Sequence, residues 1–185
     1  MLNIVGYHGT SAESAVGIIK EGFKNSEGEN EWIGKGTYFF IKGISSIPSD
    51  QALEWAIAEA WDNSNRINIY NRFAVIKSEI KVEEEHLLDL TIEDGVNILN
   101  YIIEAHKNKI QNMGRFFDYK DGYIIDFARG EGLLDIDVVK GNYYIKFAEQ
   151  RKRGINLRTA NCTICSVYEP NKNITSSTIV KEGDI

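Results

Sequence analysis

The chain has 185 residues, of which 43% are hydrophobic and 26% are charged. This composition is ordinary for a globular protein and excludes an intrinsically disordered or collagen-like chain. The 21 Lys and Arg residues against 27 Asp and Glu residues give a formal net charge of −6, which speaks against a surface generally adapted to nucleic acid or to an anionic membrane. The length, with no linker-like segment, predicts one domain over residues 1–185.

The cysteine content and hydropathy exclude two further classes. Two cysteines, Cys162 and Cys165, are too few for a disulfide framework. No apolar run approaches the roughly 20 residues that a membrane span needs. The first six residues lack the basic start and long apolar stretch of a signal peptide. We therefore expect a cytoplasmic protein with no membrane partner.

The first 41 residues predict a strand, a helix, a loop and a second strand. Residues 2–7 favour a short strand, and Thr10 or Ser11 offers the N-cap of a helix that ends at Gly22. The next stretch is polar and rich in glycine, which is typical of a loop. Residues 37–41 are aromatic and β-branched, as in a strand.

The rest of the chain predicts two more helices followed by several strands. A helix is expected to start at Ser49, residues 73–82 alternate like a half-buried strand, and Thr91 with Asp94 suggests a capping box for a third helix. From Gly122 onward we expect mostly strands, over residues 123–127, 133–139, 142–147 and 163–167. Helices that precede a run of strands predict an α+β domain with a mostly antiparallel sheet.

Three residues in the first 40 carry chemistry in a suggestive order. His8 lies where the first strand passes into a helix, so its ring presents two hydrogen-bonding nitrogens at a sheet edge. Gly9 lets a ligand approach the main chain, whose N–H and C=O match a primary carboxamide. Tyr38 offers a flat face on which an aromatic ring can stack. Taken singly, His8 and Tyr38 are better explained as a structural histidine and a core tyrosine, so their order carries the information.

The order of these motifs resembles that of a known enzyme family. His-Gly-Thr at 8–10 is followed by a helix, Gly-Phe, a loop, Gly-Lys-Gly-Thr-Tyr-Phe-Phe at 34–40 and a helix with Ala-x-x-Trp-Ala at 52–56. This resembles the ADP-ribosyltransferase family of the diphtheria-toxin and poly(ADP-ribose) polymerase type, which carries a His-Tyr-Glu triad and splits NAD. The resemblance covers residues 5–60 and implies an α+β fold whose core is a split antiparallel β-sheet with flanking helices.

The resemblance also implies how NAD, as co-substrate, would bind. His8 would hold ribose hydroxyls of NAD. The main chain of Gly9 would hold the nicotinamide carboxamide, with Thr10 nearby.

A stacking slot for the nicotinamide ring is implied as well. Tyr38 would stack on the ring, and Gly36 would lie in the turn that brings Tyr38 into position. The second helix would supply the opposite wall through Trp55 or a nearby residue. Cleavage of the nicotinamide–ribose bond develops an oxocarbenium-like cation, so such an enzyme must orient and clamp its substrate more than attack it.

The third motif departs from the family pattern, which has a carboxylate there. By register we expect Thr163 at this position, with Cys162 as the alternative. A Thr hydroxyl can bond a ribose hydroxyl but is a poor base. Glu149 and Glu169 are the nearest carboxylates, and both are expected in exposed turns.

Loss of this carboxylate argues against elongation of a polymer and leaves several functions open. The resemblance implies transfer of one ADP-ribose to a macromolecular acceptor, a protein or a nucleic acid, by a bacterial or phage effector. The alternatives are an NAD glycohydrolase, a weak or inactive NAD- or ADP-ribose-binding module, and an interaction inhibitor. The acceptor and the oligomeric state are not encoded in a recognisable motif.

Two other features have simpler explanations than a binding site. Cys162 and Cys165 match half a metal site, but residues three apart on a strand face opposite sides, so we expect no metal. Five cations lie within residues 146–158, just before the third motif. They are expected as a solvated loop, or else as an electropositive rim for a pyrophosphate or for an acidic acceptor such as RNA or DNA.

Overall fold

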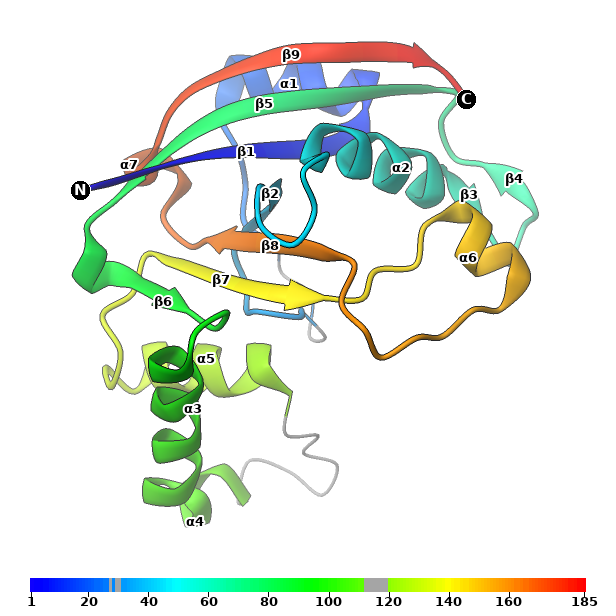
Figure 1. Ribbon diagram of the computed structural model, residues 1–185. Helices are drawn as coiled ribbons and strands as arrows, with labels where there is room; N and C mark the ends of the chain where they lie inside the picture. The colour runs from blue at the N-terminus through cyan, green and yellow to red at the C-terminus, as the bar shows by residue number, and fades with distance from the viewer. Residues whose placement is uncertain (27, 29–30, 112–119) are drawn as a thin grey trace.

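A computed structural model describes residues 1–26, 28, 31–111 and 120–185 of the chain. Its centre is a seven-stranded sheet in the order β6-β7-β8-β2-β1-β5-β9 (Figure 1). The strands are β1 (Leu2–Ser11), β2 (Thr37–Ile41), β5 (Arg72–Val82), β6 (Leu87–Asp89), β7 (Val138–Tyr143), β8 (Cys162–Val167) and β9 (Ile174–Asp184). Two short strands, β3 (Trp61–Asp62) and β4 (Ile67–Asn68), pair separately.

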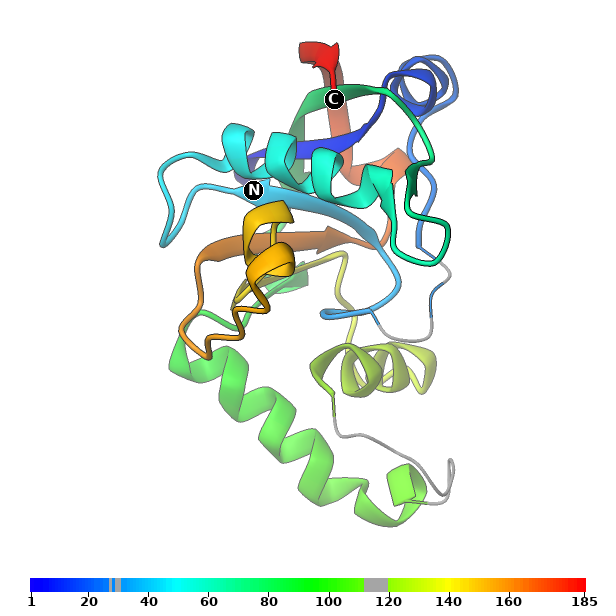
Figure 2. The same ribbon diagram turned by 90° about the vertical axis from the view of Figure 1, so that its right-hand side faces the viewer.

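The helices lie on both sides of this sheet. They are α1 (Ala12–Glu21), α2 (Pro48–Ala60), α3 (Glu93–Ala105), α4 (Lys107–Gln111), α5 (Asp121–Gly130), α6 (Ala148–Arg153) and α7 (Pro170–Asn173), with a 3-10 turn at Glu84–His86. Helix α2 runs beside β1, while α3, α4 and α5 gather below β6 and β7 (Figures 1 and 2). The fold is therefore α+β, as the sequence predicts.

The sheet is mixed and continuous rather than wholly antiparallel. Every described pairing in it is antiparallel except that of β6 with β7, which is parallel. The narrowest junction is between β1 and β2, where only Gly6 with Ile41 and Tyr7 with Phe40 are in register. The sheet that the resemblance implies to be split is therefore continuous here, and its two halves are joined only by this short junction.

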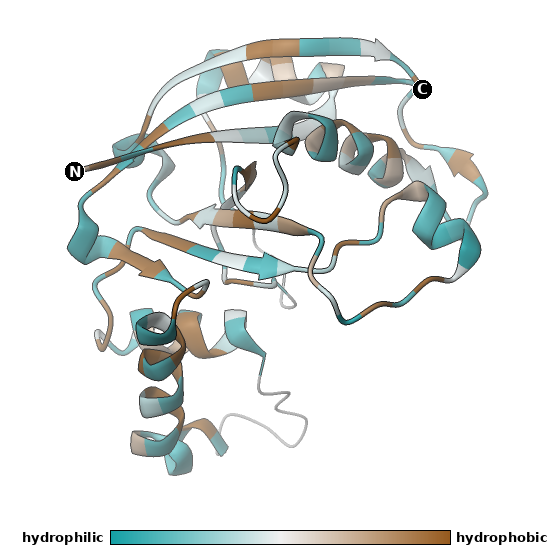
Figure 3. Ribbon diagram, viewed as in Figure 1, coloured by the Kyte–Doolittle hydropathy of each residue, from teal (hydrophilic) through white to brown (hydrophobic). Residues whose placement is uncertain are grey.

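Each face of the sheet carries its own apolar cluster. Phe40, Val75 and Ile164 belong to the first cluster, whose face we call the Tyr38 face because Tyr38 packs there. Phe39, Ile76 and Cys165 belong to the second, on the face we call the Phe39 face. Hydrophobic and hydrophilic residues are mixed along β5 and β9 (Figure 3), and burial alternates from residue to residue over 78–82 of β5, as expected where successive side chains point to opposite faces.

The first helix follows its sequence signals closely. Ser11 accepts a hydrogen bond from the Ser14 N–H at 3.0 Å, which satisfies one of the unpaired donors at the helix start. Gly22 ends α1 with φ of +88°, and its N–H donates to the Ile18 carbonyl. Glycine is favoured there because this φ is strained for residues with a Cβ.

Four local predictions are wrong. The two strands expected over residues 133–139 and 142–147 are one strand, β7, over Val138–Tyr143, because only this stretch pairs with β6 and β8. Residues 123–127 belong to helix α5, not to a strand. Helix α3 begins after Ile92 without a side-chain cap, because the Thr91 N–H and hydroxyl are both bonded to Asp89. Helix α2 begins with Pro48 at its first turn, one residue before Ser49, because proline lacks the N–H that a first-turn position leaves unpaired.

In the part of the chain that the structure describes, no helix is both long and apolar enough to cross a membrane.

Candidate functional site

His8 links β1 to β2 through its side chain. Its Nδ1 lies 2.9 Å from the Tyr38 carbonyl oxygen, so the neutral ring with a proton on Nδ1 can donate to it. The ring packs edge-on against Phe23, with centroids 5.3 Å apart, and lies 5.9 Å from Phe39. Burial lowers the pKa of His8, and the Tyr38 carbonyl only partly opposes this shift. His8 is therefore a neutral imidazole at neutral pH.

Beside His8, strands β1 and β2 no longer pair. Their register ends at Tyr7 and Phe40, although β1 continues along β5 as far as Ser11. Successive strand residues direct their main-chain groups to alternate edges. The main-chain groups that residues 8–10 direct toward β2 therefore have no partner in β2, and we call this unpaired stretch the opening between β1 and β2.

Gly9 and Gly36 are both required by close packing. A Cβ on Gly9 would lie 1.8 Å from the Ala52 carbonyl oxygen of α2, so the helix occupies the space beside this residue. A Cβ on Gly36 would lie 2.2 Å from the Ser166 hydroxyl oxygen. Thr10 pairs with Ala74 and is half-buried. These residues thus have structural roles whether or not a ligand binds at the opening.

The Tyr38 phenol holds the loop that precedes its own strand. It donates to the Gly34 carbonyl at 2.8 Å and accepts from the Ile33 N–H at 2.9 Å. Burial raises the Tyr38 pKa well above its ordinary value, and the nearby carboxylates Glu31 and Asp126 add to this effect. Tyr38 is therefore a neutral phenol with a fixed ring.

Trp32 contacts both Tyr38 and Trp55, the two rings expected on opposite sides of the nicotinamide ring. It contacts Tyr38 edge-on at 6.5 Å between centroids and Trp55 edge-on at 5.7 Å. It also stacks on Tyr143 at 6.2 Å with an interplanar angle of 10°. Trp55 faces Trp32, so the wall next to Tyr38 is Trp32, which the sequence analysis missed. No spacing signal marks it, because the contact depends on how the loop folds.

The rings of His8 and Tyr38 lie on opposite faces of the sheet. The imidazole packs on the Phe39 face with the second cluster, and Tyr38 packs with the first. Residues next to one another on paired strands share a face only when they are in register, which these two are not. The backbone hydrogen bond, not a shared pocket, brings them together.

Strand β8 places Thr163 away from Tyr38. Thr163 pairs with Ile41 on the Phe39 face and is fully buried. Its hydroxyl donates to Asn142 at 2.7 Å and accepts from the Ile44 N–H at 3.0 Å. The geometry therefore gives the hydroxyl a structural role, in contrast to the triad position expected from the register.

The β8 side chains that share the face of Tyr38 are Cys162, Ile164 and Ser166. Burial raises the pKa of Cys162 to about 12, so this alternative is a neutral thiol. Ser166 is directly opposite Tyr38, and its side chain is fully buried. None of the three is an acid.

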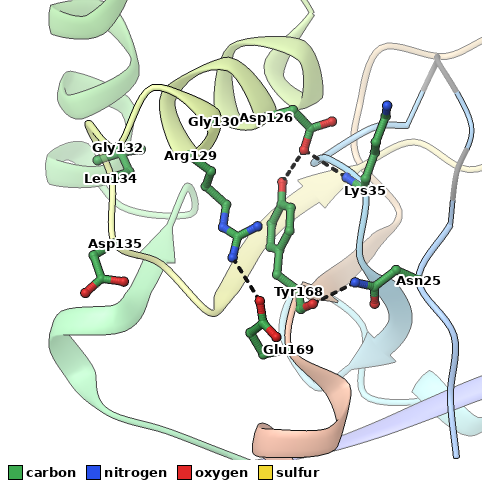
Figure 4. A pocket seen from close by; sticks show the side chains of 10 residues that line it. All are labelled: Asn25, Lys35, Asp126, Arg129, Gly130, Gly132, Leu134, Asp135, Tyr168 and Glu169. Atoms are coloured by element: carbon green, nitrogen blue, oxygen red, sulfur yellow. Dashed lines mark hydrogen bonds and ion pairs between the residues drawn. The ribbon is translucent and has the colours of Figure 1, made fainter.

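A cavity of about 730 Å³ is lined by residues of helix α5, of the loop before β2 and of the segment after β8 (Figure 4). The Arg129 guanidinium lies 4.0 Å above the Tyr168 ring and 3.4 Å from Glu169. The Tyr168 hydroxyl donates to Asp126 at 2.8 Å, and the same carboxylate oxygen accepts from the Lys35 N–H at 3.0 Å. Asp126, on α5, is one of the two carboxylates whose charge raises the pKa of Tyr38. The sequence analysis missed it because it placed this segment in a strand.

The remaining candidates are structural or exposed. Glu149 pairs with Lys152 and Arg153 in α6, and Glu169 lines the cavity of Figure 4. Cys162 and Cys165 are buried on opposite faces of β8. Among the residues described, no group of three or more His, Cys, Asp or Glu side chains could hold a metal ion.

Comparison with known proteins gives one similarity without a functional description. The chain is 34% identical over 86 residues to an uncharacterized protein of Methanocaldococcus jannaschii. This match covers 46% of the chain, which spans only 36% of the archaeal protein's length. No family model matches the chain.

Proposed function

We propose that the chain binds NAD at the opening between β1 and β2 and transfers a single ADP-ribose to a macromolecular acceptor. Two observations support this proposal. The strands that bear the three motifs are neighbours in the sheet, in the order β8-β2-β1, and β1 and β2 stop pairing at His8. The main chain of residues 8–10 at this opening supplies the donor and acceptor that a carboxamide needs. An ADP-ribosyltransferase-like arrangement is the finer fold that this strand order supports.

The reaction would require little covalent chemistry from the protein. The bond between the nicotinamide nitrogen and ribose C1′ breaks, and nicotinamide leaves with the electron pair, which neutralises its ring. An acceptor nucleophile bonds to C1′ and releases its proton to solvent or to a base. Holding the ring near Tyr38 and Trp32 would favour this step by orientation, since fixed geometry alone can supply a large part of a barrier reduction.

A binding module without turnover is the second candidate. One observation favours it: β8 presents no carboxylate on the face of Tyr38, and the Thr163 hydroxyl is already bonded on the other face. An enzyme of this geometry would need a carboxylate from an element other than β8. Glu31 and, on α5, Asp126 are described carboxylates whose charge raises the pKa of Tyr38.

Nicotinamide release from NAD by the purified protein tests the proposal, with and without cell lysate as a source of acceptor. Tyr38→Ala is the test variant. Tyr101→Ala is its matched control, because Tyr101 lies on α3 and is 72% exposed. The thermal melt of each variant shows whether it remains folded, and calorimetry measures NAD binding.

Release that needs both Tyr38 and lysate would support the transferase. Release without lysate would indicate a glycohydrolase, and binding without release would indicate a module that reads the dinucleotide. If the wild-type protein neither binds NAD nor releases nicotinamide, the proposal fails.

A further inference from the structure

The surface around α6 has the opposite sign to the whole chain. We call it the basic surface, and its cations are Lys146, Arg151, Lys152, Arg153 and Arg158. The carboxylates that pair with them are Glu59 and Glu149. Five cations against two acids leave three positive charges, in a chain whose formal net charge is −6. Such a local reversal favours an anionic partner.

Its outer cations are available to a ligand. Glu149 alone faces both Lys152, at 3.2 Å, and Arg153, at 3.6 Å. All three side chains are more than 60% exposed. Exposed ion pairs of this kind contribute little to stability, so a phosphate can replace the carboxylate at little cost. Arg158 is in no ion pair with any residue that the structure describes.

Arg151 fixes this surface against four aromatic rings in contact with one another, which we call the ring cluster: Trp55, Trp32, Tyr38 and Tyr143. Its Nη1 donates to the Ala58 carbonyl at 3.0 Å, and its Nε donates to the Lys146 carbonyl at 2.9 Å. The guanidinium lies 5.3 Å from the centre of the Trp55 ring, which in turn contacts Trp32. Helix α6 therefore sits beside α2, on the side of the molecule turned toward the viewer in Figure 2.

Trp32 adds an exposed aromatic ring to this arrangement. It is 37% exposed and is held by its stack on Tyr143. Aromatic rings next to a row of cations are typical of proteins that bind single strands, because every unpaired base has a free face on which to stack. A paired base offers no such face, and the six residues of α6 form too short a helix to read a groove.

We propose that the basic surface and Trp32 bind a single-stranded nucleic acid, with phosphates at Lys152, Arg153 and Arg158 and one base on Trp32. Binding does not depend on NAD. The ring cluster connects the basic surface to Tyr38, so the bound nucleic acid could also be the acceptor of ADP-ribose. This second step rests on the proposed function.

Fluorescence anisotropy with labelled 12-nucleotide single-stranded RNA and DNA, without NAD and at several salt concentrations, tests the binding. Lys152→Glu with Arg153→Glu should weaken binding about tenfold or more and reduce the salt slope by about 1.4, since each phosphate contact to a single strand contributes about 0.7. The matched control is Lys20→Glu with Lys107→Glu. It changes the charge equally on α1 and α4, and should leave the salt slope unchanged.

Trp32→Leu should weaken binding about fivefold or more through lost stacking, while Trp61→Leu, at the end of α2, should not. No binding at low salt, equal losses in both charge variants, or equal competition by an acidic peptide would overturn the proposal. A strand that binds but never acquires ADP-ribose in the presence of NAD would refute its role as acceptor and leave the binding proposal intact.

Discussion

Gly9→Ala separates the packing role of this residue from a ligand-binding role. The new Cβ would lie 1.8 Å from the Ala52 carbonyl oxygen and 3.2 Å from the Ala56 Cβ, whereas ordinary contacts are 3.4–4 Å. Helix α2 must therefore move away from β1 by more than an ångström. Overpacking of this kind costs about 1–3 kcal/mol, and backbone atoms cannot rotate away, so we expect the upper half of that range. For a domain of this length, the corresponding fall in melting temperature is roughly 4–12 °C.

Thermal unfolding followed by circular dichroism measures this effect, with Gly17→Ala as the control. Gly17 lies within α1 and has nothing within 4 Å of an added Cβ, so the same substitution should stabilise the helix by about 0.5–1 kcal/mol. A Gly9→Ala protein that melts at the wild-type temperature would refute the packing of α2 on β1. If such a protein also lost NAD binding, Gly9 would instead be needed for close approach of the ligand.

Two further predictions concern Thr163 on β8 and His8 on β1. Thr163→Val removes the hydroxyl shared by Asn142 and the Ile44 N–H, so it should destabilise the fold by about 1–3 kcal/mol in urea unfolding; loss of nicotinamide release at unchanged stability would instead place Thr163 at the reacting centre. The folded-state pKa of His8 is lowered, so the unfolded chain takes up the proton first and stability falls as the pH drops below about 6.5. In His8→Asn this part of the pH dependence should disappear, and parallel stability curves for the two proteins between pH 7.5 and 5.5 would contradict the neutral, buried imidazole.

The sequence predicts local features correctly where only neighbouring residues determine the structure. The Ser11 cap, the end of α1 at Gly22 and the strand at 37–41 all depend on neighbouring residues, and all are confirmed. Helix α5 could not be separated from a strand by a short apolar run alone. Its buried residues have helical spacing, which a longer window would have detected: Ile124, Ile125, Phe127 and Ala128.

The candidate site was only partly predictable because its parts meet through tertiary packing. His8 and Tyr38 were identified, and they are joined by a hydrogen bond. The contacts of Trp32 and the field of Asp126 come from a loop and from a helix about 90 residues later. No spacing rule relates such segments. The pairing register that turns each side chain toward one face or the other is set in the same way.

That register decides the chemistry open to this site. In the observed register Cys162 shares the face of Tyr38, and a shift of one residue would put Thr163 there instead. Neither side chain can serve as a strong base at neutral pH. Asp126, a described acid on helix α5, already accepts hydrogen bonds from the Tyr168 hydroxyl and from the Lys35 N–H. A carboxylate held in this way can stabilise a developing cation without moving a proton. Any turnover by this protein should therefore depend on how firmly the loop at 31–36 and the Tyr38 ring hold the substrate, and much less on a group in β8.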